Sequence, residues 1–547
     1  MNFMRNETAE KLRGGYYTPP DLALFLARWV AQGRPKTVLE PSAGDGVFIQ
    51  ALDVAGVVKA RVVAFELDTA EAAKAYERAR SLSIEADVLN RDFLGWALAE
   101  LPAGGQRFDG VVGNPPFVRY QYLPPNFQAL AEKIFAKLAC RFTKHTNAWV
   151  PFVLASVALL RPGGRLAMVV PAEIIHVLHA QSLRTFLGET CRRLVIIDPE
   201  EIWFEDTLQG AVILMAEKKQ APSDPAEGLG LVPVRGRGFL DEDPADVFAR
   251  PAPINGRTVQ GKWTRAFLDT ATRRLLDKAE ALPSVRRFND AADVDVGIVT
   301  GANKFFLVND ETVKHFGLQR WAHPMFGRSE HCPGVIYDRK QHRANGKAGL
   351  PSNFLWFADE TAGRDPDVAA YIRTGERQEL HTRYKCRIRK PWYAVPSVYS
   401  SEIGMLKRSH DAPRLILNEA GAYTTDTAYR IRSLGAPAET LVGAFVNPLT
   451  ALSAELEGRT YGGGVLELVP SEIERLLIPV PPDDAVDVQA LDRAVRTSSM
   501  EEVLTGYGSR ILEAAGLSEA ECAMLADAWI RLKNRRQRVA GKEANAA

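Results

Sequence analysis

The chain has 547 residues, of which 46% are hydrophobic and 25% are charged, and its formal net charge is +1. Single cores stop growing near roughly 250–300 residues, so this length argues against one domain and predicts two or three. No apolar run reaches the roughly 18 residues of a membrane span, and the N-terminus lacks the apolar core of a signal peptide. The small net charge leaves a nucleic-acid partner open, because cations can gather locally.

The five cysteines stand singly along the chain, and none forms a Cys-x-x-Cys pair. The sequence therefore predicts neither a disulfide framework nor a zinc site, and no other metal site is expected. Because unpaired cysteines suit a reducing compartment, we expect a cytoplasmic protein without a membrane partner.

Short apolar, β-branched runs recur in the first 220 residues, each bounded by Gly, Pro or acidic residues. They are Thr37–Leu39, Arg61–Phe65, Gly110–Val112, Arg165–Val170, Leu194–Ile197 and Ala211–Met215. Helical stretches lie between several of them, most clearly Thr69–Arg80 and Ala148–Leu160, and a Pro-Gly-Gly stop at Pro162–Gly164 follows the second. Buried parallel strands that alternate with helices predict a doubly wound α/β sheet.

A glycine-rich turn, VLEPSAGDG, follows the first of these strands at Val38–Gly46. Gly44 and Gly46 let the backbone approach a ligand at the place where doubly wound sheets bind nucleotides. The second strand ends in Glu66, whose carboxylate can accept hydrogen bonds from both hydroxyls of a ribose. The turn lacks the third glycine of G-x-G-x-x-G and the lysine of a P-loop, so a sulfonium nucleoside is favoured over NAD as its ligand.

Two further segments fit the same ligand. Asp92 and Phe93 follow a third probable strand, where the carboxylate can accept from an adenine amino group while the ring packs on the purine face. The alternative there is a surface acid beside a core phenylalanine. Thr18-Pro19-Pro20 precedes the first expected helix, Asp21–Ala31, and its alternative interpretation is an ordinary helix start, where proline is common.

A rigid loop, Gly113–Phe117, follows the fourth strand, since its two prolines cannot continue a strand. It presents Asn114 at the same sheet edge as the glycine turn. The Asn114 side-chain oxygen and the Pro115 carbonyl are neutral acceptors for the two N–H groups of an exocyclic aromatic amine, and Phe117 can stack on the base. A sulfonium already activates its methyl group, so positioning and electrostatics suffice for transfer. A base inside a duplex must flip out to reach such a loop.

The order of these motifs resembles the gamma class of N6-adenine DNA methyltransferases, the TaqI-like modification enzymes of restriction–modification systems. The resemblance extends to the last predicted strand and implies a Rossmann-like, S-adenosylmethionine-dependent catalytic domain. It implies that the cofactor is bound by Thr18, Glu40, Gly44, Gly46, Glu66, Asp92 and Phe93. It also implies that the target adenine is held by Asn114, Pro115 and Phe117.

The chain departs from the family's usual Asn-Pro-Pro-Tyr tetrapeptide, because Phe117 replaces the tyrosine. Stacking needs a ring and not a hydroxyl, so little loss is expected. The family also places a second aromatic on the other face of the base, just before the last strand of the sheet. Trp203-Phe204 occupies that place, and we assign the stacking role to Phe204. The alternative is that Phe204 is an aromatic residue of the hydrophobic core.

Cations gather with aromatics in the second half of the chain. The densest part contains Arg383, Lys385, Arg387, Arg389 and Lys390, followed at once by Trp392 and Tyr393. If this segment is a strand, its alternation puts four cations on one face, which suits DNA; a charged, solvated edge strand is the alternative. Three segments resemble pieces of the recognition domains of such enzymes: Gly297–Lys304, Lys390–Tyr393 and Thr460–Gly464.

Two segments help to place the boundaries. Residues Gln220–Gly230 are rich in Pro, Ser, Gly and Ala and predict a loop or linker. Near the C-terminus, Gly516 is a plausible helix stop, and Ser518 with Glu521 predicts a capping box that begins a last helix. The basic end of that helix predicts a solvated terminus, with phosphate contact as the alternative, and contains Lys533, Arg535, Arg536 and Arg538.

We therefore expect a catalytic domain at residues 1–240, a mixed α+β target-recognition domain at 241–480 and a helical segment at 481–547, with DNA between the first two. The predicted function is site-specific methylation of the N6 amine of a flipped-out adenine in double-stranded DNA. Thr18 lies close to the start, so no N-terminal nuclease domain is expected, and any restriction endonuclease would be encoded separately. The alternatives are an RNA base-amine methyltransferase, a catalytically silent DNA-binding subunit with this fold, and a protein-glutamine methyltransferase, which leaves the second half unexplained.

Overall fold

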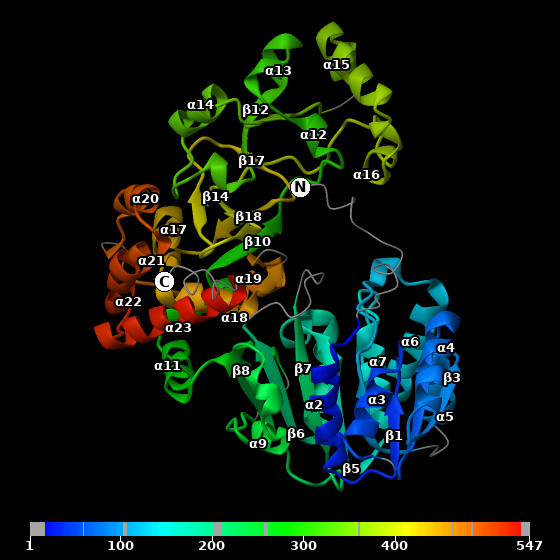
Figure 1. Ribbon diagram of the computed structural model, residues 1–547. Coiled ribbons are helices and arrows are strands. Elements are labelled where there is room, and N and C mark those ends of the chain that lie inside the picture. Colours follow the sequence, from blue (N-terminus) through cyan, green and yellow to red (C-terminus); the bar gives the residue numbers. More distant parts are fainter. Residues whose placement is uncertain are drawn as a thin grey trace, which may run out of the picture. The chain divides into compact units, whose positions relative to one another are not determined.

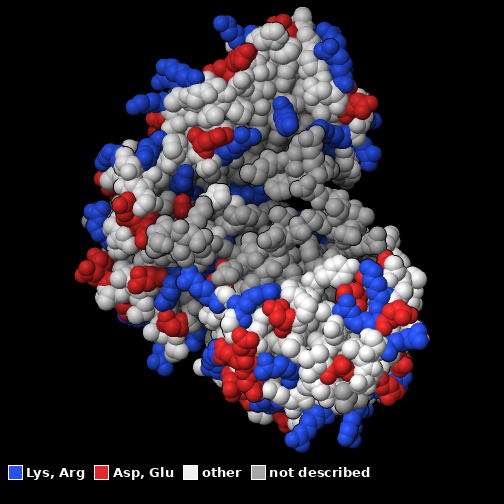
Figure 2. Space-filling model, in the orientation of Figure 1, with Lys and Arg blue, Asp and Glu red and all other residues white. Residues whose placement is uncertain are grey.

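The computed structural model describes residues 17–57, 59–101, 107–200, 210–255, 261–358, 361–461, 464–482 and 485–537 (Figure 1). The described residues up to Phe267 form one compact unit, and Leu268–Gln537 form a second. Figure 2 shows charged side chains of both signs scattered over the visible face of each unit. Within these ranges no helix is both long and apolar enough to cross a membrane, and no cluster of His, Cys, Asp and Glu could hold a metal ion.

A mixed sheet of eight strands forms the centre of the first unit, in the order β3-β2-β1-β4-β5-β7-β6-β8. Its strands are β1 Thr37–Glu40, β2 Arg61–Glu66, β3 Glu85–Asn90, β4 Phe108–Gly113, β5 Leu160–Pro171, β6 Cys191–Pro199, β7 Ala211–Lys218 and β8 Gly228–Val234. Strand β1 pairs in parallel with β2 and with β4, so that Val38 lies opposite both Val62 and Gly110. The carboxyl ends of these three strands therefore meet at one edge of the sheet.

Helices cover both faces of this sheet. They are α2 Pro20–Ala31, α3 Val47–Val54, α4 Thr69–Arg80, α5 Phe93–Glu100, α6 Pro125–Lys137, α7 Trp149–Leu159, α8 Gln181–Thr190 and α9 Pro244–Ala249. Successive strand residues point to opposite faces. Val38 and Val62 accordingly join one hydrophobic cluster, with α2 and α3, while Leu39 and Val63 join the other, with α5 and α7. Figure 1 shows α2 and α3 against the sheet.

The expectation of parallel strands throughout is wrong for β7, which pairs antiparallel with both β5 and β6. Only residues 200–210 separate β6 from β7. A parallel crossover needs a dozen or more residues and usually a helix, whereas an antiparallel neighbour needs only a short connection. The short connection therefore favours a β7 that runs antiparallel to β6.

Two other local expectations are corrected. The Pro-Gly-Gly segment is not a stop after a helix, because α7 ends at Leu159 and Pro162–Gly164 lies inside β5. The register between β4 and β5 is irregular at this segment, because Phe108 pairs with Leu160 whereas Gly110 pairs with Arg165. The expected linker Gln220–Gly230 ends inside β8, which pairs in parallel with β6.

The first unit extends beyond residue 240, where the sequence placed a boundary. Leu229 of β8 exchanges backbone hydrogen bonds with Ile254, at 2.9 and 2.8 Å between nitrogen and oxygen. Gly228 makes this approach possible, because a Cβ there would lie 2.3 Å from the Ile254 carbonyl oxygen. Trp263 is fully buried in the cluster that also contains Leu39. These contacts tie the residues before Phe267 to the sheet.

The second unit contains several small sheets surrounded by helices. Its strands are β9 Val285–Arg287, β10 Ala292–Val296, β11 Leu307–Val308, β12 Ala322–Phe326, β13 Asn353–Leu355, β14 Ile403–Leu406, β15 Arg408–Ser409, β16 Leu415–Leu417, β17 Tyr423–Thr424, β18 Ala428–Ser433, β19 Arg459–Tyr461, β20 Val465–Glu467 and β21 Leu477–Pro479. The sheet orders are β10-β18-β14-β16, β11-β13-β12-β17, β15-β20-β19 and β21-β9. Its helices are α11 Thr270–Glu280, α12 Asn303–Phe306, α13 Asp310–His315, α14 Arg339–Lys347, α15 Pro366–Arg377, α16 Tyr384–Arg387, α17 Ala438–Phe445, α18 Pro448–Glu457, α19 Pro470–Ile473, α20 Val488–Thr497, α21 Met500–Val503, α22 Ser509–Ala514 and α23 Glu519–Gln537.

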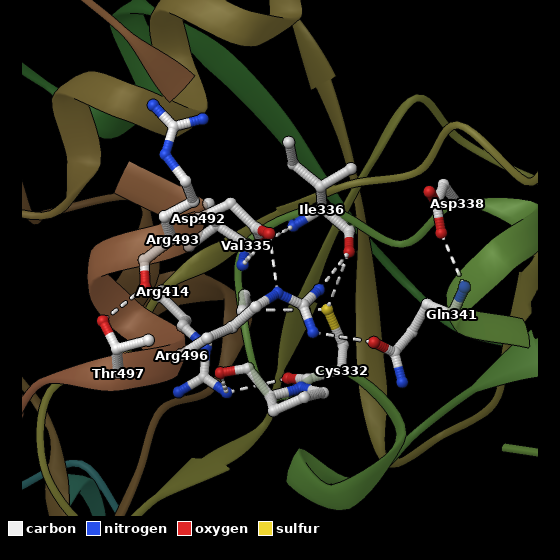
Figure 3. A network of polar contacts seen from close by, with 12 residues as sticks. Cys332, Val335, Ile336, Asp338, Gln341, Arg414, Asp492, Arg493, Arg496 and Thr497 are labelled. Carbon is white, nitrogen blue, oxygen red and sulfur yellow. Dashed lines mark hydrogen bonds and ion pairs between the residues drawn. The ribbon is translucent and has the colours of Figure 1, made fainter. Parts of the chain in front are cut away.

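The C-terminal helices pack within this second unit. Figure 3 shows Asp492 of α20, whose Oδ1 accepts hydrogen bonds from the backbone amides of Val335 and Ile336 at 2.7 and 2.9 Å. Arg496, one turn later, donates to the Gln341 side chain at 2.8 Å. Six buried apolar residues of α23, including Trp529, add hydrophobic contacts. Residues 485–537 are therefore held by specific contacts to the rest of the second unit.

The start of α23 follows the predicted capping box, whereas its end does not follow the prediction. The Ser518 amide donates to Glu521 Oε2 at 3.0 Å, and the Glu521 amide donates to Ser518 Oγ at 3.4 Å. The expected solvated terminus is wrong for Arg536, which is buried and donates to Glu455 of α18 at 2.8 Å. Arg538 lies outside the described residues.

Candidate functional site

Three loops meet at the edge where β1, β2 and β4 end. Ser42, in the glycine turn after β1, donates its hydroxyl hydrogen to the Asn114 backbone carbonyl at 2.9 Å. Asn114, in the loop after β4, donates its side-chain amide to Thr18 Oγ1 at 3.2 Å. The turn is also joined to the end of β2, because the Ala43 amide donates to the Phe65 carbonyl at 2.8 Å. The three motifs that the sequence places far apart are thus joined by direct hydrogen bonds.

The two glycines of the turn have different roles. Both have positive φ angles, +54° at Gly44 and +84° at Gly46, a region that side chains disfavour. A Cβ at Gly46 would lie 3.0 Å from Cα of Ala75 in α4, so Gly46 permits close helix packing. A Cβ at Gly44 would meet no atom within 4 Å. Gly44 therefore leaves open space at the sheet edge that a ligand can approach.

Glu66, at the end of β2, holds the turn with both carboxylate oxygens. Its Oε2 accepts from the Gly44 amide at 2.8 Å, and its Oε1 accepts from the Asp68 amide at 2.8 Å. A carboxylate has about four lone-pair positions, so each oxygen can accept a further bond from a ligand hydroxyl. This placement is compatible with the predicted role of Glu66 at a ribose.

Glu40, the last residue of β1, is a fully buried carboxyl group. Neither of its oxygens has a hydrogen-bond partner among the described residues. Burial raises the pKa of Glu40 well above its ordinary value; nearby Glu66 and Asp45 raise it further, while Arg78 lowers it. Leaving such a group unsatisfied costs about 1–3 kcal/mol. A cationic ligand at this edge would offset that cost.

Asp92 and Phe93 both contribute to the start of α5. The Asp92 carboxylate caps this helix, accepting from the amides of Leu94 and Gly95 at 3.1 Å each. The Phe93 ring is only 2% exposed and packs in the core beside Phe65, with 5.5 Å between ring centroids. The ring therefore packs mainly in the core, which was the alternative interpretation, and its contact with a purine stays a prediction.

The loop after β4 is held in place by packing and by hydrogen bonds to residues that follow it in the chain. Pro115 is buried, and Phe117 packs against both hydrophobic clusters of the first unit. Three residues later the Tyr120 amide donates to Asn147 Oδ1 at 3.0 Å. Asn147 in turn donates from Nδ2 to Glu173 Oε2 at 2.9 Å, and both side chains are buried. The amide–carboxylate pair therefore fixes the loop that carries Asn114.

Sequence reasoning missed this brace. Glu173 comes two residues after the end of β5, at the same edge as Asn114, because β5 pairs in parallel with β4. A charged residue directly after a buried strand was the available signal. Its partner Asn147 precedes α7 and follows from no local pattern.

The brace gives a stability prediction. Asn147→Asp sets two carboxylates against each other in a buried place, and we expect it to lower the free energy of unfolding by about 2 kcal/mol. Adding Glu173→Gln should restore most of that loss, because a glutamine amide can donate to the new aspartate. Urea unfolding of the wild type, both single variants and the double variant measures this. Equal midpoints for Asn147→Asp and the wild type would show that the pair does not support the fold.

The segment Arg383–Lys390 is not a strand, so the condition for cations alternating on one face is not met. Residues Tyr384–Arg387 form the short helix α16, so the cations do not alternate on one face. Arg389 turns inward, donating to the backbone carbonyls of Thr300 and Val299 at 2.7 and 2.6 Å. Arg383, Lys385, Arg387 and Lys390 are exposed. A helix replaces the strand because residues 380–389 close successive turns, among them Arg387 N to Arg383 O at 2.8 Å.

Some predicted residues lie outside the described parts of the chain. Trp203 and Phe204 fall in residues 201–209, and Gly462 and Gly463 are also outside. The expected role of Phe204 on the second face of the base therefore stays a prediction.

Comparison with known proteins matches the chain along most of its length. The family model "Eco57I restriction-modification methylase" matches residues 64–203, and "Type II methyltransferase M.Eco57I, C-terminal domain" matches residues 260–512. The Type II methyltransferase M.AccI of Acinetobacter calcoaceticus is 25% identical over 479 residues, 84% of each chain. M.XamI of Xanthomonas campestris pv. amaranthicola is 24% identical over 480 residues, 85% of each. The tRNA1(Val) (adenine(37)-N6)-methyltransferase of Porphyromonas gingivalis is 30% identical over 161 residues, 27% of this chain and 57% of that protein.

Proposed function

The chain belongs to the Eco57I family of Type II restriction-modification DNA methyltransferases, and we propose that its target is the N6 amine of an adenine flipped out of double-stranded DNA. The observation that carries this proposal is the hydrogen bond between Ser42 and the Asn114 carbonyl. It sets two neutral acceptors for an amine directly beside the turn that fits the cofactor. A methyl donor and an acceptor base can then meet at one sheet edge.

S-adenosylmethionine is the cofactor that this family implies, and the residues at the edge fit it. Its sulfonium and its ammonium group are cations, which suits the buried, unpartnered carboxyl of Glu40. Glu66 has acceptor positions for the ribose hydroxyls, and Gly44 leaves open space beside them. Thr18 and Asp92 complete the proposed cofactor set. When bound, the cofactor supplies an electrophilic methyl group.

The hydrogen bond to Thr18 orients the Asn114 side-chain amide for its proposed role, which is to accept from the target amine. Because Nδ2 donates to Thr18, Oδ1 is the end of the amide that accepts from the target amine. The Pro115 carbonyl accepts the second N–H. Two neutral acceptors draw the amine hydrogens away from the ring plane and favour a tetrahedral nitrogen, whose lone pair can attack a methyl carbon. Phe117 stacks on the base face, and no general base is needed before transfer.

The DNA and adenine assignments rest on relatives as well as geometry. M.AccI, a Type II methyltransferase, matches 84% of this chain, whereas the tRNA methyltransferase matches only 27%. That smaller relative is named for transfer to adenine N6, which favours adenine over other base amines. We assign cofactor binding and catalysis to the first compact unit and target recognition to the second.

Single-molecule sequencing of DNA from a host that expresses the chain tests this function. We expect N6-methyladenine in one short sequence context, absent from a host that expresses the Asn114→Ala variant. Methylated RNA with unmethylated DNA would favour the RNA alternative. Unmethylated DNA and RNA from a protein that still binds the cofactor would favour a silent DNA-binding subunit.

A further inference from the structure

Exposed apolar side chains concentrate in one part of the second unit. Among the large hydrophobic residues exposed in the described ranges, five come from the end of β10, from α16 and from the segments that follow them: Val296, Val299, Tyr384, Ile388 and Tyr399. Tyr384 and Ile388 are 63% and 60% exposed. Single exposed hydrophobics are ordinary, whereas a group of them marks a binding surface. We call these five residues the apolar ridge.

Hydrogen bonds hold together the backbone segments that carry the apolar ridge. The Arg389 guanidinium, one residue after Ile388, holds the Val299 and Thr300 carbonyls, which joins the two segments. Gly301 makes their close contact possible, because a Cβ there would lie 2.8 Å from Cβ of Lys385. Figure 1 shows α12 and α16 on the same side of the unit. A pre-formed surface loses little conformational entropy when it binds, so this bracing favours recognition.

A second brace holds the other end of the ridge. The Arg430 guanidinium lies 3.5 Å from the centroid of the Tyr399 ring. It also donates to Asp295 Oδ2 at 3.1 Å and to the Ser397 carbonyl at 3.0 Å. These bonds fix Tyr399 beside the end of β10.

The charged residues around the apolar ridge indicate the chemistry of its partner. The eight residues 383–390 contain five cations and no acid. Lys385 Nζ and the Arg387 guanidinium each lie 5.6 Å from the Tyr384 ring centroid. Figure 2 shows Lys and Arg side chains over the region of α15 and α16. Lysine is depleted at protein–protein interfaces, which argues against a protein partner. Cations can bind the phosphates of DNA, and an exposed aromatic ring between them can stack on a base.

We propose that Tyr384 and Ile388 form an apolar wedge that packs between or against bases of duplex DNA, while Lys385 and Arg387 bind the flanking phosphates. The inference rests on the proposed function, because it assumes a DNA substrate. Tyr384 begins α16, and Ile388 is the residue directly after the helix, in helical backbone conformation; four positions apart, they face the same side. Apolar wedges of this kind unstack base steps and bend the duplex. Arg389 serves as a positioning residue and not as a phosphate contact.

Fluorescence anisotropy of the full-length protein with labelled random-sequence duplex DNA, over a range of salt concentrations, tests the wedge. The Tyr384→Ala/Ile388→Ala variant should bind roughly tenfold more weakly with an unchanged salt slope, because stacking is lost but no phosphate contact is. Lys385→Ala/Arg387→Ala should lower the salt slope by about 1.8, about 0.9 for each phosphate contact. The matched control is Tyr76→Ala in α4, whose ring is 51% exposed and lies 5.9 Å from the Arg80 guanidinium. It should bind as the wild type does.

A second readout follows the bases themselves. Wild-type protein should raise the permanganate reactivity of thymines in bound duplexes, and Tyr384→Ala/Ile388→Ala should not, even at concentrations that saturate the DNA. Wild-type affinity and reactivity in that variant would overturn the wedge and assign the ridge to another partner, such as a protein. A wild type that binds the cofactor but no DNA would overturn the proposed function itself, so the two failures are distinguishable.

Discussion

Replacing Asn114 with alanine should lower the rate of methyl transfer by roughly 10³-fold while cofactor affinity stays nearly unchanged. The substitution removes the acceptor that orients the target amine, but it leaves the Asn114 backbone carbonyl that Ser42 contacts at 2.9 Å. The glycine turn therefore keeps its support. Transfer of labelled methyl groups to DNA, with calorimetric titration of the cofactor, separates the two effects.

Two further variants control this prediction. Ser42→Ala removes only the hydrogen bond to the backbone carbonyl, so we expect a smaller loss of rate. Asn309→Ala removes an asparagine that caps α13, where Oδ1 accepts from the Thr312 amide at 3.0 Å. It should cost about 1 kcal/mol of stability and leave transfer intact. Normal transfer by Asn114→Ala would show that this side chain does not hold the amine.

Replacing Glu40 with glutamine should change cofactor affinity and stability in opposite directions. Loss of a buried anion should weaken S-adenosylmethionine binding roughly a hundredfold. The same change should raise the stability of the cofactor-free protein by about 1–2 kcal/mol at neutral pH, because an unpartnered buried carboxyl is removed. Calorimetry measures the first effect and urea unfolding the second. Tight cofactor binding by the variant would contradict the role of Glu40.

The raised pKa of Glu40 also fixes the sign of two pH effects. The folded, cofactor-free protein keeps a proton that the unfolded chain has lost, so its stability should fall as pH rises from the unfolded pKa through the folded one. A bound cation favours the ionised carboxyl. Cofactor affinity should therefore rise with pH until Glu40 is ionised without the cofactor. Glu40→Gln should lack both trends, which distinguishes Glu40 from groups on the cofactor that titrate.

Local patterns in the sequence predict much of the first unit. Short apolar runs place β1, β2 and β4, and the glycine, proline or acidic residues that bound them place the three loops at one edge. The closeness of the glycine turn and the Asn114 loop then follows from parallel topology, whereas the Ser42 hydrogen bond comes from the structure. Helix α4 begins and ends where predicted, because Asp68 caps its first turn and small residues face α3.

Contacts between distant residues explain what the sequence did not predict. The place of β7 between β5 and β6 depends on pairing with β5, a strand about forty residues earlier in the chain. Arg389 reads as one cation in a basic run, yet it binds carbonyls about ninety residues earlier in the chain. Asn147 and Glu173 pair across α7 and β5, and neither belongs to a periodic pattern. Phe93 carries the residue type expected at a purine, but its helix turns the ring into the core.

We propose that methyl transfer to an adenine amine in DNA takes place at the edge formed by Glu40, Gly44 and Asn114. Incubating the purified chain with methyl-deuterated S-adenosylmethionine and unmethylated duplex DNA, then identifying nucleosides by mass spectrometry, tests it most directly. We predict deuterated N6-methyl-2′-deoxyadenosine from the wild type and none from Asn114→Ala. Label in N4-methylcytosine, or no labelled nucleoside from protein that binds both cofactor and DNA, would contradict the account.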